Sequence, residues 1–409
     1  MNTMLPIKRP SKTAIVLSGG GSRGAYEAGI IHYLRTQLNP AASQKLKFSI
    51  YSGSSVGAIN VAYMASAAHD LSSQGQRLLD LWSNIHAKKI YKRGPVTLGK
   101  LMLSSSLGMA FNLFGLNRFL KVDDQQPIHF QGLLNTRPFF HFLLQNVQWQ
   151  MIHQNIQDGH LDAIAVAATN TLTGQIELFL DHHPELKFQS RFIMNKTKIS
   201  PRHVMASAAL PLLFPSVAID SVYYNDAALR MNTPLTPAVH LGATDLMMIA
   251  TSSKDPQSTA HVGEVPALGD LIGTFIYSIL QDRLETDEHQ LQRINKILHT
   301  IKDNTDTTTY NSIANQLNIR PLRTLSFRPS QDITAFVDEE LKKSLRSLES
   351  FGVLEKAVIR LLEINEKKGS NLLSYFLFEP SYIKKLLELG FEDARAKHDD
   401  IMEFIEGLA

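Results

Sequence analysis

The sequence contains no cysteine, which excludes disulfide bridges, thiolate metal ligands and cysteine nucleophiles together. It also has no uncharged apolar run near the length of about 20 residues that a membrane-spanning helix needs. Its first twelve residues include no apolar stretch of signal-peptide length. We therefore expect a cytoplasmic protein that is soluble, or that touches a membrane only peripherally.

A strong excess of one charge is missing as well, since the net charge is +3 over 409 residues. This balance gives no global attraction to nucleic acid, and we expect no nucleic-acid partner. Neither an H-E-x-x-H pattern nor a calcium-loop pattern occurs, so we expect no metal. Hydrophobic residues make up 44% and charged residues 19%, which is typical of a globular protein. The composition leaves the oligomeric state open.

The first seventy residues contain two similar strand–turn–helix units. Residues 13–18 form a short β-branched, apolar run that ends at three glycines, and residues 23–38 follow with helical spacing. A second run, residues 48–52, ends at Gly53 and leads into the helix-compatible stretch 56–68. Two such units in succession predict an α/β domain with a parallel sheet.

The rest of the chain divides into three further parts. Later strand candidates are residues 163–168, 176–180, 217–219 and 246–251. Residues 84–127 are basic and then amphipathic, which predicts a cap that either contacts lipid or packs on the domain. We assign residues 12–330 to the α/β domain and residues 331–409 to a helical C-terminal region. The apolar face of that region could pack on the core, contact a partner or touch a membrane, and packing is favoured.

The first chemical motif is Gly53-Ser54-Ser55-Val56-Gly57, which has the pattern G-x-S-x-G. It lies between a predicted strand and a predicted helix, where a sharp turn would lift the serine hydroxyl clear of the backbone. Glycines on both sides relieve the crowding in such a turn. The motif predicts a nucleophile elbow with Ser55 as the nucleophile. A glycine-rich turn with a helix-capping serine is the alternative.

The second motif is the run from Gly19 to Gly24 (GGGSRG), which also satisfies the dinucleotide pattern G-x-G-x-x-G. Dinucleotide binding needs an acidic residue about 20 positions further on, and residues 39–47 contain none. We therefore expect no cofactor. Open backbone N–H groups before a helix favour a cradle for an oxyanion instead. Arg23 could brace this loop or meet a phosphate, or be an ordinary first-turn arginine.

The third motif is residues 205–215 (MASAALPLLFP), followed closely by Asp226. An aspartate after a strand and beside small residues is placed like a catalytic carboxylate on a tight loop. The alternative is a turn aspartate that bonds to its own backbone.

Together, the three motifs resemble the patatin-like phospholipase family in order, spacing and neighbours, over residues 13–251. The family's oxyanion motif is similar to Gly19, Gly20, Gly21, Arg23 and Gly24. Its nucleophile motif is similar to the segment from Gly53 to Gly57, and Asp226 falls where the family has its catalytic aspartate. Asn232 and Pro234 also fit the family pattern.

The resemblance implies a three-layer fold, in which helices flank a central and mostly parallel sheet, with residues 12–330 as the catalytic domain. It implies a Ser–Asp dyad, in which Asp226 accepts the proton of Ser55 while the glycine-rich loop holds the oxyanion. The implied substrate is a phospholipid, a lysophospholipid or another acyl-ester lipid, met at a peripheral membrane surface. In one departure, Ala227 replaces the glycine that usually follows the aspartate. If that position needs a positive φ, alanine costs about 1 kcal/mol.

Two other classes of function stay open. His182, His183 or His240 could complete a Ser–His–Asp triad in a small-ester hydrolase, although His203 and His240 fit packing or surface roles better. A peptidase could use the same dyad. The chain could also be a non-catalytic module that binds lipid or protein, which the intact Ser55, Asp226 and glycine loop disfavour.

Overall fold

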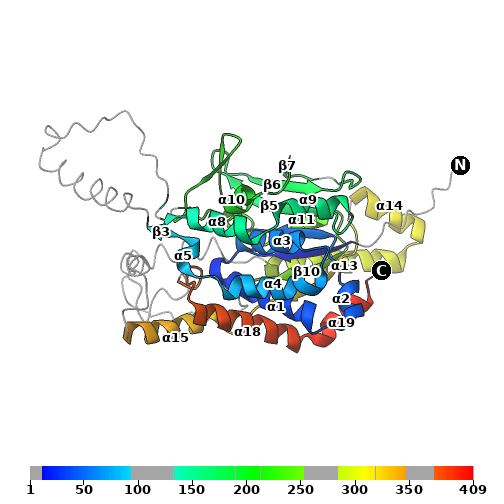
Figure 1. Cartoon of the computed structure of the whole chain (residues 1–409). Coiled ribbons are helices and arrows are strands. Elements are labelled where there is room, and N and C mark those ends of the chain that lie inside the picture. Colours follow the sequence, from blue (N-terminus) through cyan, green and yellow to red (C-terminus); the bar gives the residue numbers. More distant parts are fainter. Residues whose placement is uncertain are drawn as a thin grey trace, which may run out of the picture.

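The computed structural model describes residues 12–93, 132, 134–188, 190–211, 213–252, 284–317, 319–346 and 373–408. Most of the predicted cap, residues 94–127, lies outside the described residues. So do residues 347–372 of the predicted C-terminal region. In Figure 1 the described part forms layers, with the sheet between helices.

The main sheet of the described part has nine strands. They are β1 (Thr13–Leu17), β2 (Ile50–Gly53), β5 (Ala163–Asn170), β6 (Ile176–His182), β7 (Ile193–Lys196), β8 (Val217–Ile219), β9 (Val222–Asp226), β10 (Asp245–Ile249) and β11 (Arg323–Phe327). Their order is β11-β10-β1-β2-β5-β6-β7, while β9 pairs with β5 and with β8. The first five strands in this order run parallel, whereas β6 and β9 run antiparallel to β5. The mostly parallel sheet is confirmed.

Helices surround the sheet on both faces. They are η1 (Gly21–Arg23), α1 (Gly24–Thr36), α2 (Pro40–Lys45), α3 (Val56–Ser66), α4 (Leu71–Ser83), α5 (Ala87–Ile90), α8 (Arg137–Asn146), α9 (Trp149–Gln157), α10 (Pro201–Ser207), η4 (Ala227–Leu229), α11 (Leu235–His240), α13 (Leu284–Asn304), α14 (Thr307–Leu317), α15 (Ile333–Arg346), α18 (Pro380–Ala396) and α19 (His398–Glu406). A small separate sheet pairs β3 (Lys92–Arg93) with β4 (Leu134–Asn135). No helix in the described ranges is long and apolar enough to cross a bilayer.

Strand β1 shows why the fold has three layers. Successive side chains of a strand point to opposite faces of the sheet, so one apolar run serves two cores. Ile15 and Leu17 are buried in the core shared with α1, α3, α4 and α18. Ala14 and Val16 are buried in a second core with α11 and α13. The helical C-terminal region is present, and its helix α18 packs on α1 and α4 (Figure 1). The domain boundary at residue 330 stays a prediction.

The parallel strands also determine where the motifs meet. β1 and β2 are parallel neighbours, and Leu17 and Gly53, their last residues, are partners in register. The glycine-rich loop that follows β1 and the turn that follows β2 therefore leave the sheet at the same edge. Adjacent parallel strands open a crevice at their carboxyl ends, which is where open α/β sheets bind ligands.

Candidate active site

Ser55 lies on the sharp turn between β2 and α3, as the G-x-S-x-G motif predicts. Its backbone has φ 52° and ψ −123°, a combination that L-residues rarely adopt. Gly57 makes the turn possible, because a Cβ there would lie 2.3 Å from the carbonyl oxygen of Leu17 and 2.7 Å from that of Ser18. The Ser55 N–H donates to the hydroxyl of Ser207 at 2.9 Å, which helps to hold the turn.

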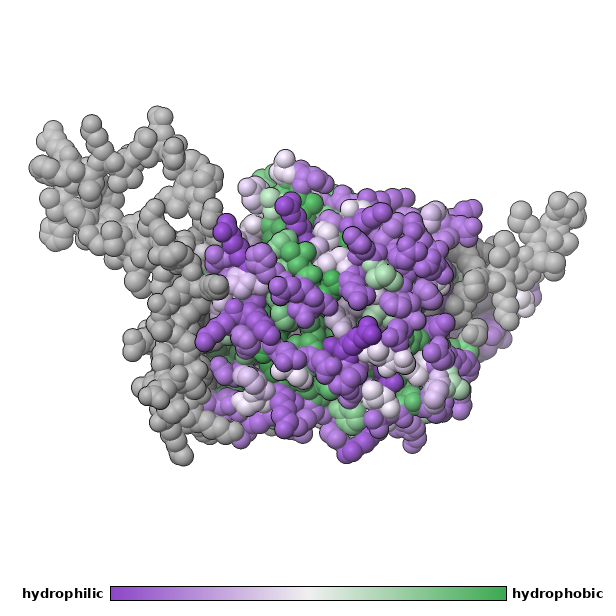
Figure 2. Space-filling model, viewed as in Figure 1, coloured by the Kyte–Doolittle hydropathy of each residue, from purple (hydrophilic) through white to green (hydrophobic). Residues whose placement is uncertain are grey.

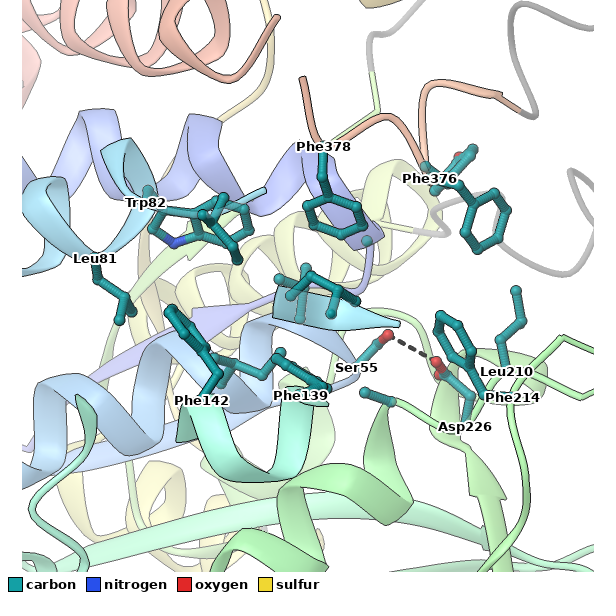
Figure 3. Close-up of a pocket in the computed structure, with 17 residues that line it drawn as sticks. Ser55, Leu81, Trp82, Phe139, Phe142, Leu210, Phe214, Asp226, Phe376 and Phe378 are labelled. Atoms are coloured by element: carbon teal, nitrogen blue, oxygen red, sulfur yellow. Dashed lines mark hydrogen bonds between the residues drawn. The ribbon is translucent and has the colours of Figure 1, made fainter. Parts of the chain in front are cut away.

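Asp226 lies beside Ser55, although 171 residues separate the two in the chain. The hydroxyl of Ser55 donates to Asp226 Oδ2 at 2.7 Å, the dashed line in Figure 3. Strand β5 brings them together, since it pairs with β2 near Ser55 and with β9, which ends at Asp226. The other carboxylate oxygen of Asp226 accepts from the N–H of Ala228 at 2.8 Å.

Both side chains are buried, with Ser55 7% exposed and Asp226 1% exposed. Burial raises the pKa of Asp226 to about 7, although hydrogen bonds from the N–H of Ala228 and from Ser55 pull that pKa down. A carboxylate with an ordinary pKa near 4 is a poor base towards serine in water. The pKa of Asp226 therefore falls in the range where a general base works well at neutral pH.

The glycine-rich loop lies beside the Ser55–Asp226 pair. Gly21 lines a pocket together with Ser55 and Asp226. The N–H of Gly19 is occupied, because it donates to the carbonyl oxygen of Asn232 at 3.1 Å. No described residue accepts a hydrogen bond from the N–H of Gly20 or Gly21. These two amides are thus the members of the loop that could bind an oxyanion.

The pocket beside the Ser55–Asp226 pair is lined mainly by apolar side chains (Figure 3). Helices α4 and α8 contribute part of its wall, and the segment after α10 contributes another part. The labelled apolar residues are Leu81, Trp82, Phe139, Phe142, Leu210, Phe214, Phe376 and Phe378. Such a lining suits a long hydrocarbon chain better than a polar substrate.

Comparisons with known proteins identify the family of the chain. The model of the family described as "Patatin-like phospholipase" matches residues 15–239, which is more than half of the 409-residue chain. The chain belongs to the patatin-like phospholipase family. Lipid hydrolysis is therefore its general function. None of the curated proteins matches the chain.

The solved structures to which the chain is similar belong to distant proteins. VipD from Legionella pneumophila is 11% identical, with a TM-score of 0.31 and coverage of 98% of this chain and 88% of VipD. Human GIVD cytosolic phospholipase A2, in complex with methyl gamma-linolenyl fluorophosphonate, is 10% identical, with a TM-score of 0.43 and coverage of 97% and 59%. Pseudomonas aeruginosa ExoU, in its complex with SpcU, is 15% identical, with a TM-score of 0.27 and coverage of 90% and 69%.

Arg23 and Gly24, the last two residues of the glycine-rich motif, are in close contact with neighbouring parts of the chain. The buried guanidinium of Arg23 donates to Ser374 and Tyr375, so it braces the loop against the C-terminal region. Gly24 faces Val56 and Trp82, and a Cβ on it would lie 2.4 Å from the Val56 side chain. Of the roles considered for Arg23, the structure supports bracing of the glycine-rich loop.

Ala227, the departure from the family pattern, fits without strain. It lies in the short helix η4 directly after Asp226, and it is not among the described residues with a positive φ. Its buried methyl group packs with Ala167 and Leu178. The cost expected for a positive φ therefore does not arise here.

No histidine lines the pocket in the part of the chain that the structure describes. The ring of His203 stacks on Phe179 with centroids 4.5 Å apart, and burial lowers its pKa to about 4. His240 lies 3.4 Å from the hydroxyl of Ser190, and His182 is paired with the carbonyl oxygen of His183. Among described residues, no group of three or more His, Asp or Glu side chains could hold a metal ion.

Two contributions to the site were not predicted from the sequence. Ser207 supports the backbone of Ser55, and residues 373–378 form part of the pocket. Ser207 sits within the small-residue run before Asp226, but nothing in that run distinguishes a supporting hydroxyl from a packing one. Residues 373–378 carried only an apolar pattern, which is equally typical of ordinary core packing.

Proposed function

We propose that the chain hydrolyses carboxylic esters of phospholipids or lysophospholipids through a Ser55–Asp226 dyad. In this mechanism the Asp226 carboxylate accepts the proton of Ser55 while the serine oxygen attacks the ester carbonyl. The resulting oxyanion is bound by the N–H groups of Gly20 and Gly21. The alcohol leaves with the proton from Asp226. Water then attacks the acyl-serine, again through Asp226, and releases the fatty acid.

The observation that carries the proposal is the 2.7 Å hydrogen bond from the Ser55 hydroxyl to a buried aspartate whose pKa is raised. A nucleophile and a base within hydrogen-bonding reach of one another are the minimum for this chemistry. The apolar pocket next to them supplies a place for the acyl chain. Burial also excludes water, which keeps the carboxylate basic.

The test is release of fatty acid from phospholipid vesicles by the native chain and by Ser55→Ala. Ser66→Ala is a matched control, because Ser66 is also a buried serine, at the end of α3. Among the described groups its hydroxyl bonds only to the carbonyl oxygen of Tyr63. We expect Ser55→Ala to abolish release and Ser66→Ala to retain it, with both variants folded by circular dichroism. Release of fatty acid by Ser55→Ala at the native rate would contradict the proposal. Inactivity of the native chain towards all esters would favour a non-catalytic binding module.

We further propose that the chain meets its substrate at a membrane surface through two neighbouring turns. Leu172 is 85% exposed on the turn after β5, and Tyr223 is 55% exposed at the start of β9. The turns touch, since the N–H of Thr171 donates to the carbonyl oxygen of Tyr223 at 2.9 Å. Strand β5 continues past Val166, the partner of Gly53, so the turn projects beyond the Ser55 edge of the sheet.

The chemistry of these turns suits a lipid interface. Tyrosine and leucine favour the boundary between headgroups and acyl chains, and arginine favours anionic headgroups. Arg230 is exposed and donates to the carbonyl oxygen of Gly174 on the same turn. On the face seen in Figure 2, a strip of hydrophobic residues also crosses a mostly hydrophilic surface.

Vesicle co-sedimentation of Leu172→Asp tests the membrane contact. Leu317→Asp is the control, because Leu317 is also an exposed leucine, 57% exposed, but lies at the end of α14 and not on either of the two turns. Moving a leucine out of an apolar environment costs about 2 kcal/mol, so we expect Leu172→Asp to weaken partitioning by more than about tenfold. Leu317→Asp should match the native chain. Equal partitioning of the two variants would contradict the assignment of these turns.

A further inference from the structure

Residues 373–378, which we name the C-terminal strap, lie directly against the glycine-rich loop. The N–H of Ser22 donates to the carbonyl oxygen of Tyr375 at 2.9 Å. The hydroxyl of Ser22 donates to the carbonyl oxygen of Ser374 at 2.7 Å. Two buried hydrogen bonds from one loop residue thus join parts of the chain that are about 350 residues apart in sequence.

Arg23 fastens the strap a second time. Its Nε donates to the hydroxyl of Ser374 at 2.9 Å, and one terminal nitrogen donates to the hydroxyl of Tyr375 at 3.1 Å. The guanidinium carbon also lies 3.9 Å from the centroid of the Tyr375 ring. Arg23 is only 4% exposed, so breaking these contacts would remove hydrogen bonds from a buried charge.

Helix α18, which follows the strap, is held tightly to α1. A Cβ on Gly29 of α1 would lie 2.1 Å from the carbonyl oxygen of Leu387, and a Cβ on Gly390 of α18 would lie 2.1 Å from that of Tyr26. The two glycines therefore let the helix backbones touch. The hydroxyl of Tyr382 on α18 also donates to the carbonyl oxygen of Ser374 at 3.0 Å. The strap is anchored on both sides.

The anchored strap places two aromatic rings in the wall of the pocket. Phe376 and Phe378 line it from the opposite side to Phe139, with Ser55 between them in Figure 3. The ring of Phe376 meets that of Phe214 edge-on, with centroids 6.4 Å apart. Residues from near both ends of the chain thus enclose one apolar space beside the Ser55–Asp226 pair.

We propose that the C-terminal strap determines substrate specificity: Phe376 and Phe378 give the site its preference for long acyl chains over short ones. This inference rests on the proposed function, because it assigns the apolar pocket to the acyl chain. A long chain gains contact with the strap, worth about a fourfold change in affinity for each buried methylene. A butanoyl group gains fewer of these contacts. Loss of one ring should therefore cost long chains more than short ones.

The first test compares kcat/KM for p-nitrophenyl decanoate and p-nitrophenyl butanoate in the full-length chain and in Phe378→Ala. We expect the decanoate-to-butanoate ratio to fall by about tenfold, through KM for decanoate. Phe391→Ala is the control, because Phe391 lies on α18 and packs on Tyr33, with ring centroids 5.2 Å apart, away from the pocket lining. General destabilisation lowers both rates together and leaves the ratio unchanged, as we expect for this control.

A binding measurement separates the strap from the dyad. Dissociation constants of decanoate and hexanoate, measured by displacement of a fluorescent fatty acid, depend on the pocket and not on chemistry at Ser55. In Phe378→Ala the preference for decanoate should shrink, and the milder Phe376→Leu should shrink it less. If the native chain prefers decanoate and Phe378→Ala loses that preference, but the native chain hydrolyses no ester, the proposed dyad is overturned and the role of the strap is upheld. Equal preference in native chain and variants, or no fatty-acid binding, would overturn the strap.

Discussion

Two buried aspartates of the same sheet have opposite surroundings. Asp245 begins β10, is 2% exposed, and accepts from Arg323 Nε at 2.6 Å and from the hydroxyl of Thr244 at 2.8 Å. Asp226 ends β9, is 1% exposed, and accepts from the Ser55 hydroxyl and the Ala228 N–H. Among the described residues, no cationic side chain pairs with Asp226.

The difference shows what burial does with and without a counter-charge. A neighbouring cation favours the charged carboxylate and removes its basicity, whereas burial alone raises the pKa and creates basicity. Asp245 therefore suits a structural ion pair at the amino end of its strand. Asp226 suits proton transfer, at a cost in stability. Substitutions at the two positions should therefore have different effects.

The largest expected difference is in activity. Asp226→Asn keeps the shape of the side chain but removes the base, and we expect acyl release to fall by about 10³-fold. Asp245→Asn should change specific activity less than about threefold, because its partner Arg323 lies on β11, outside the pocket lining. Initial rates on phospholipid vesicles measure both. Full activity in Asp226→Asn would show that another residue acts as the base.

The next largest expected effect is on the pH dependence of hydrolysis. Asp226 acts as a base only when ionised, and its pKa is raised to about 7. The rate should therefore fall about tenfold for each pH unit below 7 and level off above it. Asp245→Asn should show the same profile. A rate that stays flat from pH 5 to pH 8 would show that no group with a pKa near 7 limits the reaction.

Stability should respond in opposite directions at the two sites. The Asp226 pKa is about 7 in the folded chain against 3.8 unfolded, so its burial penalty is absent below pH 4, grows with pH and is complete above pH 7. Asp226→Asn should then stabilise the chain at pH 8 by up to about 4 kcal/mol, and by nothing at pH 3.5.

Asp245→Asn should instead destabilise the chain at pH 8, by about 1 kcal/mol, because Arg323 is 42% exposed and solvent screens the pair. Urea unfolding of both variants at pH 3.5 and pH 8 measures the two effects. Destabilisation of the chain by Asp226→Asn at pH 8 would contradict the account of the buried carboxylate.

Local patterns predicted the strands that carry the motifs. The apolar runs at residues 13–18 and 48–52 correspond to β1 and β2, because a buried parallel strand is apolar on both faces and ends abruptly at glycine. The glycine spacing likewise predicted the turn at Ser55, since only residues without a Cβ fit there. Strand β7 was not predicted, because its exposed, mixed sequence IMNK has no clear alternation.

The strap shows what a local pattern cannot predict. Its apolar residues suggested packing, but whether they face a core or a substrate pocket depends on contacts with a loop about 350 residues earlier. The same holds for Arg23, whose partners Ser374 and Tyr375 are supplied only by the folded chain. The pairing of Asp226 with Ser55 was predicted through the family resemblance. Spacing alone could not distinguish Asp226 from a turn aspartate.

The central claim is that Asp226 activates Ser55, and covalent labelling tests it most directly. The native chain and Asp226→Asn are treated with an alkyl fluorophosphonate, and the modified peptide is identified by mass spectrometry over time. The account predicts a single adduct on Ser55 in the native chain, formed at least about 100-fold more slowly in Asp226→Asn. Equal labelling rates in the two proteins, or an adduct on another residue, would contradict it.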